Sequence, residues 1–257
     1  MNRNDETEGD FAGAATRTVL ADLYRRPFVV RRPAAPTVPF VFAMPHGGRT
    51  YPDAFTAASR LALSQLRLSE DAYTDILFGD AADRAPTIAA RFPRAYIDVN
   101  REPDELDPAL FETPLDRPVK RTAHVEAGFG AIARIVRDGM PIYDHKLATA
   151  EIEERFDRLY RPYHAALAEL IAETRDRFGF AVLVDCHSMP DAPAEADIVL
   201  GDRFGASAPA AVIRRAAAVF AAEGFSVARN APYAGGYITG LYGRGNEGIH
   251  AFQIELN

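Results

Sequence analysis

The stretch from Ala181 to Pro190, AVLVDCHSMP, constrains the fold more than any other part of this sequence. Its apolar first half is typical of a buried strand in a parallel sheet, and its polar second half indicates the carboxyl end of that strand. Ligands bind at that edge in open α/β sheets. His187, placed there, can offer a neutral ring nitrogen to a metal while a nearby carboxylate or carbonyl sets its tautomer. The alternative is a hydrogen-bonded histidine that only caps a core strand.

The composition predicts one domain that acts on a small molecule. A chain of 257 residues, 48% of them hydrophobic, can bury a large core. We predict a disordered arm over residues 1–15, which are polar and aperiodic, and a single domain over residues 16–257. A net charge of -7 and a pI near 5.4 argue against nucleic acid or an anionic membrane as partner, because both require a basic face.

The sequence also favours a cytoplasmic location. Its first residues, MNRNDETEGD, do not resemble a secretion signal, and it contains no apolar run of membrane-spanning length. The single cysteine, Cys186, excludes an internal disulfide and a cysteine zinc cluster, and it suits a reducing compartment. Because Cys186 lies inside a predicted strand, we expect a buried, inert thiol rather than a catalytic one.

Strand and helix patterns follow one another along the chain. Besides the strand at Ala181, we predict strands over 28–32, 38–43, 198–201, 225–229 and 248–257. The predicted helices cover 53–66, a segment from Ser69 onward, 146–178 and 206–223. Pro162 should kink or split the longest helix, and His164 beyond it is interpreted as structural, with support of a site residue as the alternative. Residues 102–141, rich in proline and charge, predict a long surface excursion.

Two further stretches carry candidate metal ligands. His46 follows a predicted strand in MPHGGRTYP, where glycines allow a tight turn beside a ligand, although an ordinary glycine-rich turn with an incidental histidine would look the same. Asp71 and Asp75 lie four residues apart near a predicted helix start, so we expect them to share a helix face and one of them to complete a metal site. An acidic pair facing solvent is the commoner fate of such residues.

The last predicted strand carries a candidate base. Its alternation places Ala251, Gln253 and Glu255 on one face and larger apolar residues on the other. Catalytic zinc typically takes three protein ligands and leaves one position open, and a separate carboxylate acts as general base. His46, Asp71, His187 and Glu255 can supply these parts, although no spacing among them is diagnostic and there is no HExxH motif.

Candidate substrate-binding residues lie in two other segments. Residues 87–100, TIAARFPRAYIDVN, and the following Arg101 crowd charges around an apolar strand, as in a site or a salt-bridge network. Residues 230–246, NAPYAGGYITGLYGRGN, contain five glycines and three tyrosines, which suits a loop that wraps a ligand. Within it, Gly235, Gly236 and Tyr237 are the candidates.

Seven motifs, in order, resemble the N-formylglutamate amidohydrolase family: MPHGG, DAYTD, RAYIDVNR, RPYH, DCHSMP, NAPYAGGYIT and FQIEL. The resemblance covers most of residues 38–256, and that family is similar to zinc carboxypeptidases and aspartoacylase. It implies a zinc-carboxypeptidase-like fold, a single-domain three-layer α/β sandwich with a mixed, mostly parallel sheet between helices. It also implies a bacterial zinc enzyme of histidine degradation.

The resemblance implies roles for individual residues. His46, His187 and an acidic residue, best matched by Asp71, would bind zinc. Glu255 would be the base that activates water and then passes a proton to the leaving amine. Arg94 would stabilise the oxyanion. Asn100 and Arg101 would bind the substrate α-carboxylate, for which a guanidinium is well shaped.

The sequence departs from the family pattern at three places. Zinc carboxypeptidases have a glutamate where Arg49 stands, so the acidic ligand must come from elsewhere, and Asp71 and Asp75 stay open. Many family members have a basic residue after YIT, where this chain has Gly240, which leaves the acyl-amino-acid substrate open. We also expect the family to continue past Asn257.

The leading hypothesis is therefore zinc-dependent hydrolysis of the C–N amide bond of a small N-acyl amino acid. N-formyl-L-glutamate, yielding L-glutamate and formate, is the first candidate. The alternatives are a deacylase or carboxypeptidase-like hydrolase for another N-acyl amino acid or short peptide, and a metal-free binding protein of the same fold.

Overall fold

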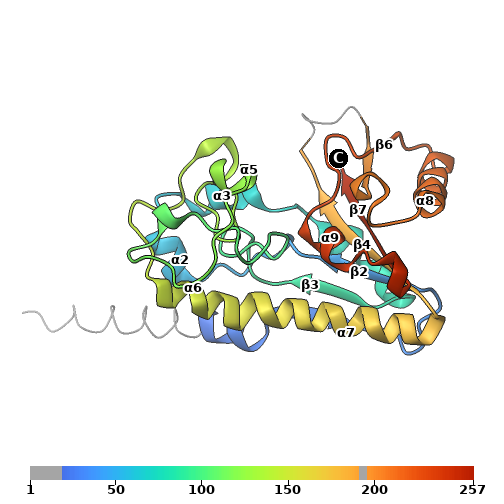
Figure 1. Cartoon of the computed structure of the whole chain (residues 1–257), viewed down its shortest axis with the longest axis horizontal. Helices are drawn as coiled ribbons and strands as arrows, with labels where there is room; N and C mark the ends of the chain where they lie inside the picture. The colour runs from blue at the N-terminus through green and yellow to red at the C-terminus, as the bar shows by residue number, and fades with distance from the viewer. Residues whose placement is uncertain (1–18, 191–195) are drawn as a thin grey trace, which may run out of the picture.

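A seven-stranded mixed sheet runs through residues 19–190 and 196–257, the part of the chain that the computed structural model describes (Figure 1). Its order is β1-β3-β2-β4-β7-β5-β6, and β3, β2, β4 and β7 run parallel to one another. The strands are β1 (Phe28–Arg31), β2 (Phe40–Met44), β3 (Thr87–Ala90), β4 (Ala181–Ser188), β5 (Ile198–Gly201), β6 (Val227–Arg229) and β7 (Ile249–Leu256). Strand β1 is antiparallel to β3, and β5 is antiparallel to β7. The predicted mixed, mostly parallel sheet is confirmed.

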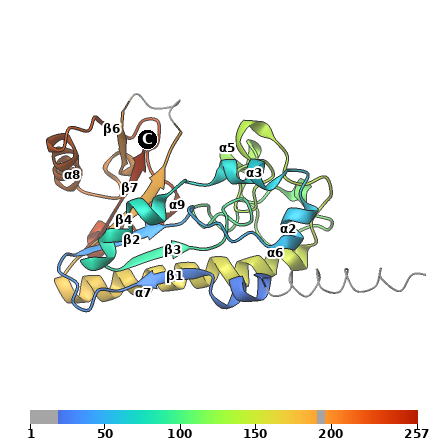
Figure 2. The ribbon, with the colours of Figure 1, turned by 180° about the vertical axis from the view of Figure 1, so that it is seen from behind.

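Helices cover both faces of the sheet, so the predicted three layers are present (Figures 1 and 2). On one face, β-strand residues such as Leu183 and Ala251 pack in one apolar cluster with α7 (Arg161–Phe178) and α9 (Tyr237–Tyr242). On the other face, Val184 and Phe252 pack with α8 (Ala210–Ala222). The alternation predicted for the last strand therefore separates the two layers correctly.

The longest predicted helix forms without a break. It consists of α6 (Thr149–Arg155), a π-helical turn over Phe156–Tyr160, and α7. Pro162 lies in the first turn of α7 and has no N–H to donate, and the preceding π turn accommodates it. The predicted kink is thus replaced by a change in helix type. Gly179 follows α7 with a left-handed φ of 83°, so the helix ends at the predicted residue, Phe178.

Two helix predictions are wrong because distant contacts override local signals. Residues 53–66 form α2 (Asp53–Ala58) and α3 (Leu63–Leu66), since the Ser59 hydroxyl and the Arg60 N–H both donate to the Ile142 carbonyl between them. The segment after Ser69 is not helical until α4 (Thr74–Leu77).

The remaining elements are short. The surface excursion predicted over 102–141 is buried in part, because Leu106, Phe111 and Ile132 belong to the apolar core. The segment contains only α5 (Ala123–Glu126) and two 3-10 turns, Pro108–Leu110 and Arg137–Gly139. It packs beside α2, α3 and α6 at one end of the molecule (Figure 2). The other 3-10 turns are Arg67–Ser69, Gly79–Asp83, Arg203–Gly205 and Gly245–Glu247. Residues 230–246, predicted as a loop, contain α9.

The arm predicted over residues 1–15 lies outside the described residues. Over 19–190 and 196–257, none of the helices has both the length and the apolarity needed to cross a membrane.

Candidate active site

The carboxyl ends of three neighbouring parallel strands meet at the candidate site. His46 follows β2, His187 is the next-to-last residue of β4, and Glu255 has the same place in β7. Because β4 lies between β2 and β7, and because His187 is in register with Glu255, these side chains converge at one edge of the sheet. This is the edge at which open α/β sheets bind ligands.

His46, Asp71 and His187 form a buried cluster with metal-site geometry. One possible ligand atom from each residue lies within 4.8 Å of the other two. Asp71 Oδ2 lies 3.3 Å from Nδ1 of His46 and 2.6 Å from Nδ1 of His187. All three side chains are almost fully buried, with relative exposures of 2%, 8% and 3%. The two histidines therefore present the same type of nitrogen to one shared space.

Two further aspartates orient the imidazoles. Nε2 of His46 donates to Asp98 Oδ1 at 2.7 Å, and Nε2 of His187 lies 3.0 Å from Asp185 Oδ1. A proton on each Nε2 leaves the Nδ1 lone pair directed at the cluster, which is the tautomer that a metal requires. Neither aspartate had been assigned a role from sequence. The sequence indicates this role more clearly for Asp185, since it lies two residues before His187 and shares its strand face.

The donor set fits a divalent cation. Nδ1 of His46 is buried and has no hydrogen-bond partner among the residues described. A bound cation would give this nitrogen a partner. Burial opposes ionisation of Asp71, but the two neighbouring imidazoles outweigh it and hold the pKa of this carboxyl well below its usual range. Two imidazole nitrogens and one carboxylate are a usual ligand set for a metal with an open position.

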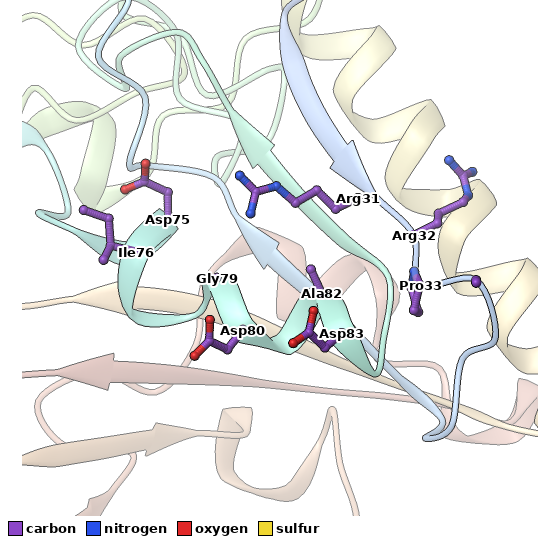
Figure 3. A pocket seen from close by; sticks show the side chains of 10 residues that line it. Arg31, Arg32, Pro33, Asp75, Ile76, Gly79, Asp80, Ala82 and Asp83 are labelled. Atoms are coloured by element: carbon purple, nitrogen blue, oxygen red, sulfur yellow. The ribbon is translucent and has the colours of Figure 1, made fainter.

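Asp71 and Asp75, the two candidates for the acidic ligand, lie in different environments. Asp71 precedes α4 and faces the histidines, and its N–H donates to the His46 carbonyl. Asp75 lies inside α4, bonds Arg49 at 2.6 Å, and lines a separate surface hollow of about 720 Å³ (Figure 3). The expectation that both aspartates share a helix face is wrong, because Tyr73 between them has a left-handed φ of 63°.

Arg94 connects the carboxylates around the cluster. Its Nη1 donates to Asp71 at 3.2 Å and its Nη2 donates to Asp98 at 2.9 Å. The guanidinium therefore lies directly beside the candidate metal ligands with a quarter of its side chain exposed. Its positive charge can act on negative charge that develops near the cluster.

Glu255 lies beside this cluster in an environment that favours its protonated form. Gln253 Nε2 donates to Glu255 Oε1 at 2.5 Å, and Gln253 Oε1 in turn accepts the Gly236 N–H at 3.0 Å. Burial, more than the nearby charges, raises the pKa of Glu255 to about 7. A carboxyl with this pKa can both accept and donate a proton near neutral pH.

Asn100 joins the cluster to the glycine-rich segment. Its Nδ2 donates to Asp185 and lies 3.2 Å from Nε2 of His187, while its Oδ1 accepts the Ile238 N–H. A Cβ on Gly236 would lie 2.5 to 2.8 Å from this carboxamide, so glycine is required there. The side chain of Asn100 is thus hydrogen-bonded inside the protein, and its expected role with a substrate carboxylate stays a prediction.

A pocket of about 430 Å³ adjoins Asn100. Four other predicted site residues, Arg101, Gly235, Gly236 and Tyr237, line it. Arg203 and His124 line it too, and sequence reasoning missed both. Arg203 follows β5, the strand antiparallel to β7, and the strand direction could not be read from the pattern of residues.

His164 is structural, as interpreted. Its Nε2 lies 2.9 Å from the Val99 carbonyl and its Nδ1 lies 3.0 Å from the Tyr242 hydroxyl. The residue joins α7 to the segment before Asn100 and to α9. Cys186 is buried, and burial raises the pKa of its thiol, as expected for an inert cysteine.

The chain is similar to known proteins over most of its length. The N-formylglutamate amidohydrolase family matches residues 38–257. The chain belongs to this family. An N-formylglutamate deformylase of Pseudomonas aeruginosa is 32% identical over 230 residues, which cover 85% of this chain and 80% of that protein. A second, from Pseudomonas putida, is 30% identical over 231 residues with the same coverage.

A solved structure shows the same fold. The N-formylglutamate amidohydrolase from Ralstonia eutropha JMP134 superposes with a TM-score of 0.84 at 36% identity, covering 90% of this chain and 86% of that one. The α/β architecture predicted from the motifs is therefore shared with a family member of known structure.

Proposed function

We propose that this chain hydrolyses the formyl amide bond of N-formyl-L-glutamate, which yields formate and L-glutamate. Family membership supports this amidohydrolase activity. The observation that carries the proposal is the buried cluster of His46, Asp71 and His187 beside Glu255, because amide hydrolysis needs an electrophilic centre and a proton acceptor at one place.

We propose zinc as the metal, held by His46 Nδ1, Asp71 and His187 Nδ1. Mixed imidazole and carboxylate donors suit a catalytic zinc. When bound, the metal would polarise the scissile carbonyl and make water a stronger nucleophile. Asp98 and Asp185 keep both imidazoles in the required tautomer.

The residues around the cluster supply the other steps. Glu255 accepts a proton from the attacking water and delivers it to the leaving amine nitrogen, so the same carboxylate is regenerated in each turnover. Gln253 holds Glu255 in place through one hydrogen bond. The Arg94 guanidinium stabilises negative charge on the carbonyl oxygen in the transition state.

The adjoining pocket receives the amino-acid part of the substrate. Arg101 donates only to the carbonyls of Phe129 and Asn100, and it forms no ion pair within residues 19–190 and 196–257. We assign it to the substrate α-carboxylate, with Gly235, Gly236 and Tyr237 as the adjacent wall. The single buried Cys186 favours a reducing compartment, so we place the enzyme in the cytoplasm.

A metal and substrate panel tests this function. The purified protein is stripped with a chelator, reloaded with zinc or left metal-free, and assayed for formate release from N-formyl-L-glutamate and for acetate release from N-acetyl-L-glutamate. We expect fast, zinc-dependent hydrolysis of the formyl substrate. Zinc-dependent cleavage of the acetyl compound alone would support the wider deacylase alternative, and full activity without metal would refute the proposed site.

A further inference from the structure

We infer that Arg203 is a specificity-determining residue that binds the side-chain carboxylate of an acidic N-acyl amino acid. This inference rests on the proposed function and adds to it the residue that distinguishes an acidic substrate from a neutral one. It comes from the charges and the backbone geometry of the pocket of about 430 Å³ next to Asn100.

Two positively charged side chains in the pocket, those of Arg101 and Arg203, are available to bind a ligand. Of its two acids, Glu102 binds Lys120 at 2.8 Å, and Glu105 accepts hydrogen bonds from the Thr122 hydroxyl and the Glu102 N–H. Burial and the nearby Arg101 lower the pKa of His124, which keeps its imidazole neutral at pH 7. Arg101 and Arg203 form no ion pairs within residues 19–190 and 196–257.

Two guanidinium groups in one pocket match two carboxylates in one ligand. If Arg101 holds the α-carboxylate, a second carboxylate on the same molecule has Arg203 as its partner. An arginine donates to a carboxylate through two parallel N–H groups, which adds geometric selectivity to the charge. The pocket therefore favours a dicarboxylate over an equally large neutral amide.

Glycines allow the Arg203 side chain to lie along the pocket wall. Its Nη1 donates to the Gly236 carbonyl at 3.2 Å. A Cβ on Gly240 would lie 3.1 Å from Cζ of Arg203, and a Cβ on Gly235 would lie 3.3 Å from its Cγ. A side chain at position 240 would therefore be in steric conflict with the guanidinium of Arg203.

The backbone at Arg203 is held in an uncommon conformation. Arg203 and Phe204 have left-handed φ values of 52° and 58°, which is rare for residues with side chains and concentrates at functional sites. The fully buried Asp202 anchors this turn by accepting from Arg229 and Asn230, and the Arg203 N–H donates to the Ala234 carbonyl at 2.7 Å. The fold therefore fixes the direction in which Arg203 leaves the main chain.

Matched substrates and variants test the assignment. N-formyl-L-glutamate and N-formyl-L-glutamine have the same shape and differ in the side-chain charge. For Arg203→Gln we expect kcat/KM on the glutamate substrate to fall about ten- to a hundredfold, mainly through KM, with little change on the glutamine substrate. Arg215→Gln removes one charge from the exposed face of α8 and should leave both values unchanged.

Gly240→Ala provides a second variant that leaves Arg203 in place. The added methyl group should displace the guanidinium and raise KM for the glutamate substrate selectively. Equal losses on both substrates in Arg203→Gln, or an unchanged ratio in both variants, would overturn the assignment while the deformylase function stands. A wild-type enzyme that cleaves neither substrate with zinc would instead refute the proposed function.

Discussion

Asp98 provides a direct test of the metal site, because it contacts no reacting group in the proposed mechanism. Its carboxylate accepts hydrogen bonds from His46 Nε2 at 2.7 Å, from the Asn100 N–H at 2.8 Å and from Arg94 Nη2 at 2.9 Å. In Asp98→Asn, Oδ1 can still accept from His46 and Asn100, but the new amide N–H groups face the N–H groups of Arg94. The variant loses the negative charge that makes His46 a stronger ligand.

The expected effect is a weaker zinc affinity with the fold retained. Loss of an outer carboxylate typically lowers metal affinity 10- to 100-fold, which corresponds to about 1.4–2.8 kcal/mol. Competition with a chromophoric chelator measures the zinc Kd, and circular dichroism checks that the variant is folded. Asp75→Asn is the matched control, since Asp75 binds Arg49 away from the cluster. A Kd for Asp98→Asn within twofold of the wild type would refute this account of the site.

Two further predictions concern proton transfer and pH. Glu255→Gln should keep the fold and the zinc but lose at least about 10²-fold in kcat for N-formyl-L-glutamate, and turnover near the wild-type value would remove Glu255 as the base. Burial lowers the pKa of His164 to about 4, so the unfolded chain binds more protons between pH 6.5 and 4. The protonation of His164 alone should therefore lower the free energy of unfolding by about 3 kcal/mol as the pH drops through that range. Urea titrations should show this contribution as the difference between the wild type and His164→Gln.

The strands that were predicted well are those whose hydrophobic pattern matches their burial in the fold. The apolar run of β4 is buried on both faces, and the alternation of β7 separates the two helix layers, so both strands could be located from hydrophobicity alone. The ends of these strands then placed His187 and Glu255 at one sheet edge. The order of the strands was not visible in the pattern, and the family resemblance implied only that the sheet is mixed and mostly parallel.

The segment around Asp71 shows where local signals fail. The sequence from Ser69 to Asp71 looks like the start of a helix. However, the Ser69 hydroxyl donates to the Leu66 carbonyl, and the Asp71 N–H donates to the His46 carbonyl. These contacts, and the left-handed Tyr73, postpone α4 to Thr74. The chain thereby turns Asp71 into the cluster, which a regular helix from Ser69 would not do. A tertiary hydrogen bond outweighed the capping preference.

The difference between Arg101 and Arg203 shows how far sequence reasoning can reach into a pocket. Arg101 follows directly after a recognisable motif, RAYIDVNR, whereas Arg203 comes after a short strand whose direction decides which end of the sheet it reaches. Strand β5 runs antiparallel to β7, with Gly201 opposite Gln253, and this brings the chain back beside Gly235 and Gly236. The pocket therefore combines one arginine that a motif identifies with one that only the sheet topology places there. The role proposed for Arg203 therefore rests on that topology, whereas the role proposed for Arg101 follows from a motif.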